Sequence, residues 1–297
     1  MGTAHPMQEG AKIGTRCFGC YHPAMSMDET VLVDARGLAK KYGSGARVVD
    51  DVSFSIRRGE TLGLVGESGS GKSTVGRMLL RLVESTAGEV RYAGEDLLSM
   101  SSREMRGMRR RMQIVFQDPF AALNPRMSVR EILAEPFAIH HERPAEGLTA
   151  RLAEMLLTVG LDSSAMERFP HEFSGGQRQR INIARALALK PEFLVLDEPV
   201  SALDVSVGAQ VINLLRELQV TYGLTYLFIS HSMPLVRYLC DRVAVMRRGR
   251  LVEMGEYEQV CDAPREEYTR QLIATTPEMP IFDVREIGKG KTSSVGR

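Results

Sequence analysis

The chain has 297 residues, of which 43% are apolar and 25% charged, and its 38 basic and 37 acidic side chains leave a net charge of +1. This balance is typical of a globular chain and excludes a nucleic-acid binder that relies on overall positive charge. No apolar run reaches the roughly 20 residues that a membrane-spanning helix needs. Four cysteines in so long a chain do not make a disulfide framework, so we expect a cytosolic protein.

Residues 1–29 show no periodic pattern of apolar side chains, and we expect a disordered leader there. Met25 and Met27 stand just before the first periodic segment, so the sequence indicates one of them as the native start. Cys17, Cys20 and His22 supply three zinc ligands where a structural site needs four, so metal binding is not the favoured interpretation of this segment.

Ordered sequence begins near Thr30 with the apolar run Val31–Arg36, and apolar and polar residues then alternate over 52–56 in the manner of a half-buried strand. The compact apolar run Thr61–Val65 is typical of a buried parallel strand. A helix is predicted directly after Gly66–Lys72. Its apolar face consists of Val75, Met78, Leu79 and Leu82.

The middle of the chain, about residues 118–190, is mostly helical in pattern. Its predicted helices are Val129–Phe137, Thr149–Val159 and Gln177–Leu189, and its prolines, predicted to interrupt helices, are Pro119, Pro125, Pro136, Pro144 and Pro170.

Strand patterns return at Phe193–Leu196 and Tyr226–Ile229, with a helical pattern over 211–218 between them. Alternating strands and helices on both sides of a helical insertion predict an α/β fold. It has a parallel-sheet core, an antiparallel β subdomain at its start and a helical subdomain over about 118–190. We expect one domain over residues 30–255 and a polar, partly helical C-terminal extension over 256–297.

A glycine-rich loop between the strand Thr61–Val65 and the helix after it matches the pattern G-x-x-x-x-G-K-[ST]. The glycines allow a tight backbone whose N–H groups face phosphate oxygens, and the helix adds its positive end. Lys72 is expected to reach the β- and γ-phosphates, and the Ser73 hydroxyl to bind Mg²⁺. The predicted nucleotide-binding residues are Gly66, Glu67, Ser68, Gly69, Ser70, Gly71, Lys72, Ser73 and Thr74.

Two acidic residues, Asp197 and Glu198, end the apolar strand that begins at Phe193. A strand parallel to the one before the loop delivers its C-terminal residues to the nucleotide edge of the sheet. Asp197 is therefore a candidate magnesium ligand, and Glu198 a candidate base for the water that attacks the γ-phosphate.

A second candidate phosphate site begins at Ser174, a residue typical of a helix N-cap, followed by Gly175, Gly176 and Gln177. One triphosphate has no obvious need for two such sites in one chain. The sequence therefore predicts that two copies meet head to tail, one supplying the glycine-rich loop and the other the capped helix.

With its Ser-Gly-Gly-Gln motif, the chain resembles the ATP-binding subunits of ABC transporters over about residues 30–275. The resemblance implies a P-loop NTPase fold with a RecA-like core, ATP and Mg²⁺ as ligands, and ATP hydrolysis. It also implies that Tyr42 stacks on adenine, that Gln117 contacts Mg²⁺ and water, that Asp204 lies at the dimer interface, and that His231 contacts the γ-phosphate. Ser232 stands where the family more often has aspartate.

Two stretches, Val115–Pro125 and Asp197–Val207, resemble the branch of dipeptide, oligopeptide and nickel importers, in the form of its second ATPase subunit. Tyr268 and Thr269 match part of that branch's C-terminal element. The resemblance implies two permease subunits, a second ATPase subunit (a paralogue or a second copy), and indirectly a solute-binding protein. It implies no nucleic acid, and a peripheral position on the cytoplasmic side of the cell membrane.

The alternative is a soluble ABC-type ATPase that serves translation, nucleic-acid repair or phosphonate breakdown. Translation members usually carry two cassettes, and repair members carry long insertions, neither of which this chain has. Phosphonate-associated ATPases are closer in sequence and stay open at this point. A simple P-loop kinase would leave Ser174–Gln177 without a purpose.

Overall fold

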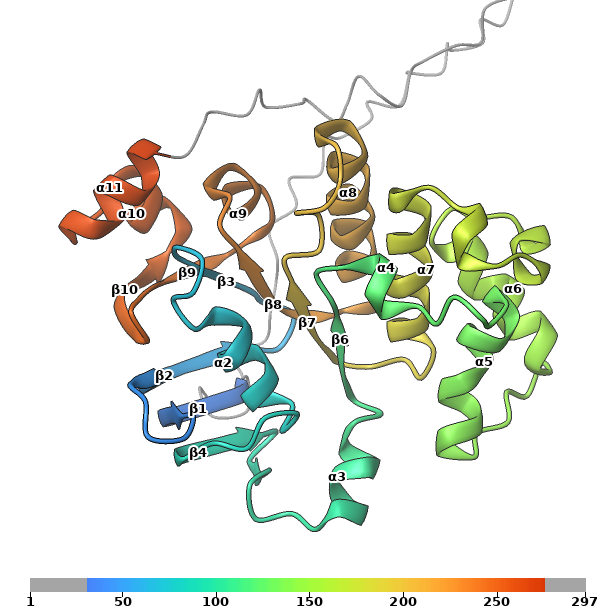
Figure 1. Cartoon of the computed structure of the whole chain (residues 1–297), viewed down its shortest axis with the longest axis horizontal. Helices are drawn as coiled ribbons and strands as arrows, with labels where there is room; N and C mark the ends of the chain where they lie inside the picture. Colours follow the sequence, from blue (N-terminus) through green and yellow to red (C-terminus); the bar gives the residue numbers. More distant parts are fainter. Residues whose placement is uncertain (1–30, 276–297) are drawn as a thin grey trace, which may run out of the picture.

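The computed structural model describes residues 31–275, which form an α/β fold with two sheets (Figure 1). The predicted leader, with its cysteines and candidate start residues, and residues 276–297 lie outside the described residues.

The larger sheet has the strand order β10-β9-β3-β8-β7-β6. Its strands are β3 (Thr61–Val65), β6 (Met112–Val115), β7 (Phe193–Asp197), β8 (Thr225–Ser230), β9 (Arg242–Arg247) and β10 (Arg250–Glu256). All neighbours pair in parallel except β10, which is antiparallel to β9. The predicted parallel core is therefore confirmed, whereas β9 and β10 were not predicted.

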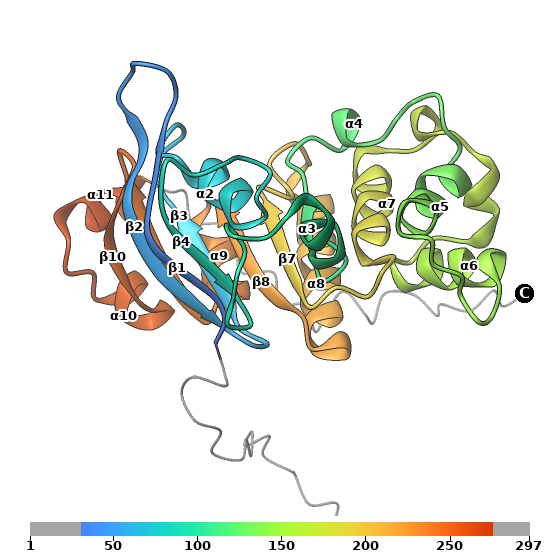
Figure 2. The ribbon, with the colours of Figure 1, turned by 90° about the horizontal axis from the view of Figure 1, so that it is seen from below.

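The smaller sheet is antiparallel, with the order β2-β1-β4-β5, as the predicted β subdomain requires. Its strands are β1 (Val31–Lys41), β2 (Arg47–Arg57), β4 (Ala87–Tyr92) and β5 (Glu95–Asp96). Figures 1 and 2 both show β1, β2 and β4 on the opposite side of the molecule from the helices α5 (Val129–His140), α6 (Leu148–Thr158) and α7 (Gly175–Leu187).

The central strands bury both of their faces, and alternate residues enter different hydrophobic cores. In β7, Phe193 and Val195 pack with the antiparallel sheet and α2 (Lys72–Leu79), whereas Leu194 and Leu196 pack with the helical segment and α8 (Val205–Tyr222). This two-residue period explains why a continuous apolar run is a strand here, because a sheet covered on both faces needs no polar positions.

The remaining helices are α3 (Ser102–Met108), α4 (Pro119–Ala122), α9 (Met233–Leu239), α10 (Tyr257–Asp262) and α11 (Glu267–Thr275). Among residues 31–275, no helix combines the length and the apolar character that crossing a membrane requires.

Two local predictions were wrong. Pro136 lies inside α5 and does not end it; the buried Ile132, Leu133 and Phe137 pack on either side of the proline and offset the backbone hydrogen bond lost there. Helix α2 ends at Leu79, so Leu82 lies beyond it and is exposed. In the C-terminal extension, Tyr268 is buried in the main core.

We expect Leu196→Ala to lower the free energy of unfolding by about 2–5 kcal/mol, because Leu196 has no exposed surface and its truncation leaves a cavity. Urea denaturation measures this loss. Leu157→Ala in α6 is the matched control, since Leu157 is 64% exposed and its truncation should change stability by about 0.5 kcal/mol or less. Equal losses for the two variants would contradict the assigned core.

Candidate functional site

The glycine-rich loop joins β3 to α2, as predicted, and two of its glycines are required by close backbone neighbours. A Cβ on Gly66 would lie 2.1 Å from the Met246 carbonyl oxygen, and one on Gly71 would lie 2.5 Å from that of Val48. Both residues also have φ in the region that favours glycine, +148° and +103°. The loop can therefore take this course only with glycine at these two positions.

Lys72, the first residue of α2, is buried, and its ammonium group lies within the loop. Its Nζ donates hydrogen bonds to the carbonyl oxygens of Gly66 (2.7 Å) and Glu67 (2.8 Å). Burial lowers the pKa of Lys72, although the charges of Glu198, Asp197 and Glu67 act in the opposite direction. A cation held away from water in this way is a strong partner for phosphate.

Asp197 ends β7 and is only 1% exposed. Its Oδ1 accepts a 2.7 Å hydrogen bond from Ser73 Oγ, and Arg77 lies 3.8 Å from Oδ2. Burial raises the pKa of Asp197, and the Ser73 hydrogen bond acts against that rise.

The Ser73 hydroxyl and the Asp197 carboxylate are hard oxygen ligands of the kind that Mg²⁺ binds together with phosphate oxygens and water. Within residues 31–275, no cluster of three or more His, Cys, Asp or Glu side chains forms a metal cage. The hydroxyl and the carboxylate together fit a magnesium ion whose other ligands are phosphate oxygens and water.

Three side chains meet just beyond the ends of the neighbouring strands β6, β7 and β8. Gln117 Nε2 donates a 3.1 Å hydrogen bond to Glu198 Oε2, and His231 Nδ1 lies 3.4 Å from the same oxygen. Because parallel strands end at the same edge of the sheet, residues far apart in the chain converge here.

Glu198 adopts a left-handed backbone conformation, with φ of +48°, which is uncommon for a residue with a side chain. Its N–H donates to the Ile229 carbonyl (3.0 Å), and its own carbonyl accepts from Ser201 N (3.2 Å) and Oγ (3.1 Å). Strained backbone held by surrounding contacts is common at functional sites. Here it aims a carboxylate at Gln117 and His231.

A cavity of about 470 Å³ joins the loop to these groups. Its lining consists of Val48, Ser68, Gly69, Gly71, Lys72, Ser73, Thr74, Gln117, Glu198 and His231. Val48, from β2, was not predicted, because it lies outside the alternating segment 52–56 and the residues around it give no signal for a place at the cavity. The Ser70 hydroxyl is buried and finds no hydrogen-bond partner among residues 31–275.

Tyr42, predicted to stack on adenine, follows the end of β1, is 52% exposed and does not line the cavity. Lys40 Nζ lies 4.9 Å from the centre of its ring.

The predicted second phosphate site forms the N-terminus of α7. Ser174 is its N-cap, and Ser174 and Gln177 bond each other's backbone N–H groups, at 3.4 and 3.0 Å. Ser174 is exposed, and neither it nor Gly175, Gly176 or Gln177 lines the cavity beside Lys72. Within one chain, the structure therefore does not bring the two predicted phosphate sites together.

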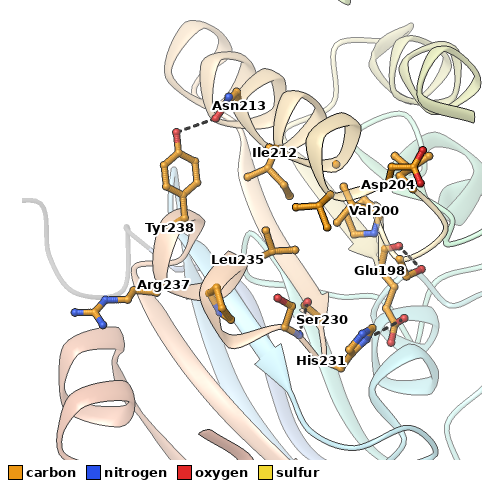
Figure 3. Close-up of a pocket in the computed structure, with 18 of the residues that line it drawn as sticks. Glu198, Val200, Asp204, Ile212, Asn213, Ser230, His231, Leu235, Arg237 and Tyr238 are labelled. Atoms are coloured by element: carbon orange, nitrogen blue, oxygen red, sulfur yellow. Dashed lines mark hydrogen bonds and ion pairs between the residues drawn. The ribbon is translucent and has the colours of Figure 1, made fainter. Parts of the chain in front are cut away.

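A second, mostly apolar cleft of about 440 Å³ opens beside Glu198 and His231, between α8 and α9 (Figure 3). Glu198 and His231 point toward one another at one end, and Tyr238 lies at the other, where its hydroxyl donates a 2.9 Å hydrogen bond to Asn213. Asp204, the exposed N-cap of α8, also borders this cleft.

Residues 49–201 match a family model described as ABC transporter. A putative peptide import ATP-binding protein of Brucella ovis is 53% identical over 262 residues, which are 87% of this chain and 82% of that protein. The oligopeptide transport ATP-binding protein AppF of Bacillus subtilis is 50% identical over 81% of this chain and 74% of its own length.

Two solved structures have similar folds. The cbiO1 protein of Clostridium perfringens, part of the ABC transporter complex cbiONQ, has a TM-score of 0.71 and 26% identity, and the match covers 79% of this chain and 92% of that one. An ATP-binding cassette solved as a dimer in a post-hydrolysis state with ADP and Pi has a TM-score of 0.69 and 28% identity, over 76% of this chain and 99% of its own.

We expect Asp197→Asn to raise the melting temperature of the nucleotide-free protein at neutral pH. A carboxyl whose pKa is higher in the folded chain than in the unfolded one costs folding free energy when it is ionised. The gain should shrink as the pH falls through the raised pKa of Asp197 toward the ordinary value of 3.8. Thermal unfolding over this pH range, with the exposed Asp204→Asn as control, measures the effect. A lower melting temperature at neutral pH would contradict it.

Proposed function

This chain belongs to the ABC transporter ATP-binding family, and from that membership we propose that it is the subunit that hydrolyses ATP to drive the import of peptides or related small solutes. Membership of this family implies that the chain binds nucleotide, hydrolyses ATP and acts in an ABC transporter. Peptides are proposed as the solute because the relatives at 50–53% identity are named for peptide or oligopeptide transport.

The observation that supports the site assignment best is one cavity lined by both the loop and the cluster of Gln117, Glu198 and His231. We assign Lys72 and the loop N–H groups to the β- and γ-phosphates. Water attacks the γ-phosphorus, the bond to the β-phosphate oxygen breaks, and Glu198 accepts the proton that the water loses. Gln117 and His231 hold Glu198 in position through the contacts described above. We also propose that Gln117 contacts the attacking water and that His231 contacts the γ-phosphate.

Ser73, Asp197 and Gln117 are proposed to hold Mg²⁺ when ATP binds, since Ser73 bonds Asp197 and lines the same cavity as Gln117. The ion would neutralise charge on the phosphate oxygens.

We propose that the N-terminus of α7, from Ser174 to Gln177, completes the site of a second ATPase subunit in a head-to-tail dimer. Two observations support this arrangement: Ser174, the N-cap, is exposed, and the helix tip is absent from the lining of the cavity beside Lys72. Tyr42 and Asp204 keep their proposed roles at the adenine ring and at the dimer interface, since both are exposed on the monomer.

Membership of the family implies membrane-embedded permease partners and dimerisation. We further propose that there are two permeases, that a solute-binding protein delivers the solute, and that the chain lies on the cytoplasmic face of the membrane. The assignment to the second-subunit type is also a proposal, as is the division into a domain over residues 30–255 and an extension from residue 256. The names of the relatives disfavour a soluble ATPase without a transporter.

Replacing Glu198 by Gln should lower the rate of ATP hydrolysis by about 10²- to 10⁴-fold while ATP binding is retained, because the amide keeps the shape but accepts no proton. Phosphate release and equilibrium ATP binding measure the two effects. Glu217→Gln, an exposed position on α8, is the matched control. Normal turnover by the Glu198 variant would contradict its assigned role.

Lys72→Ala should instead weaken ATP binding itself, by about tenfold or more, since it removes charged hydrogen bonds to phosphate. Isothermal titration calorimetry with MgATP measures the dissociation constant. An unchanged constant would remove Lys72 from the phosphate site.

The head-to-tail proposal predicts that Glu198→Gln forms a dimer only with ATP, and that adding Ser174→Arg prevents this dimer while each monomer still binds ATP. Ser128→Arg is a matched control, because Ser128 caps α5 with the same reciprocal bonds, here to Glu131. Sedimentation velocity with and without ATP distinguishes the variants. An ATP-dependent dimer that tolerates Ser174→Arg as well as Ser128→Arg would overturn the arrangement.

A further inference from the structure

The C-terminal helix α11 contacts the start of the glycine-rich loop directly. The Glu67 N–H donates a 3.2 Å hydrogen bond to the hydroxyl oxygen of Tyr268, the second residue of α11. Tyr268 is only 5% exposed, and the Arg247 guanidinium lies over its ring, 4.5 Å from the centre. A helix residue 201 positions further along the chain thus contributes a contact to the start of the loop.

The bonded N–H belongs to the same peptide unit as the Gly66 carbonyl, which accepts one of the two hydrogen bonds from Lys72 Nζ. Because a peptide unit is planar, a hydrogen bond on its N–H side also orients its carbonyl. Gly66 has φ of +148°, a value that residues with a side chain rarely adopt. Because glycine has wide conformational freedom, Gly66 by itself restricts the orientation of this peptide only weakly. Tyr268 supplies an external constraint on it.

Helix α11 is itself fixed firmly enough to act as such a constraint. The turn before it is held by Glu253 of β10, whose carboxylate accepts hydrogen bonds from the N–H groups of Arg265 (2.9 Å) and Glu266 (3.2 Å). Burial alone would raise the pKa of Glu253, but these and neighbouring hydrogen bonds outweigh it and lower the pKa. Tyr268 and Leu272 pack in the main hydrophobic core.

We propose that Tyr268 is a positioning residue for nucleotide binding: its hydroxyl orients the Gly66–Glu67 peptide, and through that peptide it sets the place of the Lys72 ammonium group. The C-terminal extension is thereby part of the ATP site without touching the nucleotide. This inference rests on the proposed role of Lys72 at the phosphates.

The test is Tyr268→Phe in the full-length chain, which removes the hydroxyl and keeps the ring under Arg247. Losing one hydrogen bond of ordinary strength should raise the dissociation constant for MgATP about two- to tenfold, and lower the melting temperature of the nucleotide-free protein by about 2–4 °C, because the bond is also present without nucleotide. Tyr222→Phe is the matched control, because Tyr222 is 52% exposed at the end of α8. Calorimetry and thermal unfolding give the two readouts for each variant.

Measured on Lys72→Ala, the added Tyr268→Phe change should weaken ATP binding no further, since the group it positions is gone. Two outcomes would overturn the inference. One is a Tyr268→Phe variant that binds ATP as tightly as the unmodified chain, with or without a lower melting temperature. The other is an equal additional loss in the Lys72→Ala background. If Lys72→Ala itself binds ATP normally, the proposed role of Lys72 at the phosphates is wrong. That result distinguishes a failure of the proposed phosphate site from a failure of the proposed role of Tyr268.

Discussion

The site depends above all on the parallel pairing of β3, β8, β7 and β6. Parallel strands in register end at one edge of the sheet, and this edge collects the glycine-rich loop after β3, Gln117 after β6, Asp197 and Glu198 at the end of β7, and His231 after β8. The fully buried, two-faced strands make this register costly to shift, because a slip of one residue would exchange the side chains between the two cores. The relative positions of these side chains therefore depend on the register of the sheet.

Around this edge, burial sets the electrostatics. Lys72 and Asp197 are both removed from water. Burial lowers the pKa of Lys72 and raises that of Asp197, and both shifts favour the neutral form of the side chain. Neither charge is stabilised by burial as such; each is kept by partners within the site, including the loop carbonyls for Lys72 and Ser73 for Asp197. The phosphates of ATP offer Lys72 a partner of opposite charge, which is a physical reason for ATP binding to stabilise the folded chain.

The glycine-rich loop is held from outside as well. Met246 and Val48 approach two of its glycines, and Tyr268 bonds the peptide between Gly66 and Glu67. The capped tip of α7, in contrast, is attached to its own subdomain and remains away from the cavity. In the proposed head-to-tail dimer, one phosphate site is built within the chain and the tip of α7 completes the site of a second subunit.

The sequence by itself determined the buried strands β3, β7 and β8, the loop, the acidic pair and the capped α7. Period-two burial, helix capping and phosphate binding each depend on residues that are close together in the chain. It failed where distant packing outweighs a local preference, as at Pro136 in α5, which neighbouring side chains keep helical. Val48 at the cavity, the left-handed backbone of Glu198 and the contact of Tyr268 with the loop were decided only by tertiary structure. Each depends on which strands and helices become neighbours in space, and that adjacency has no signal in the residues around it.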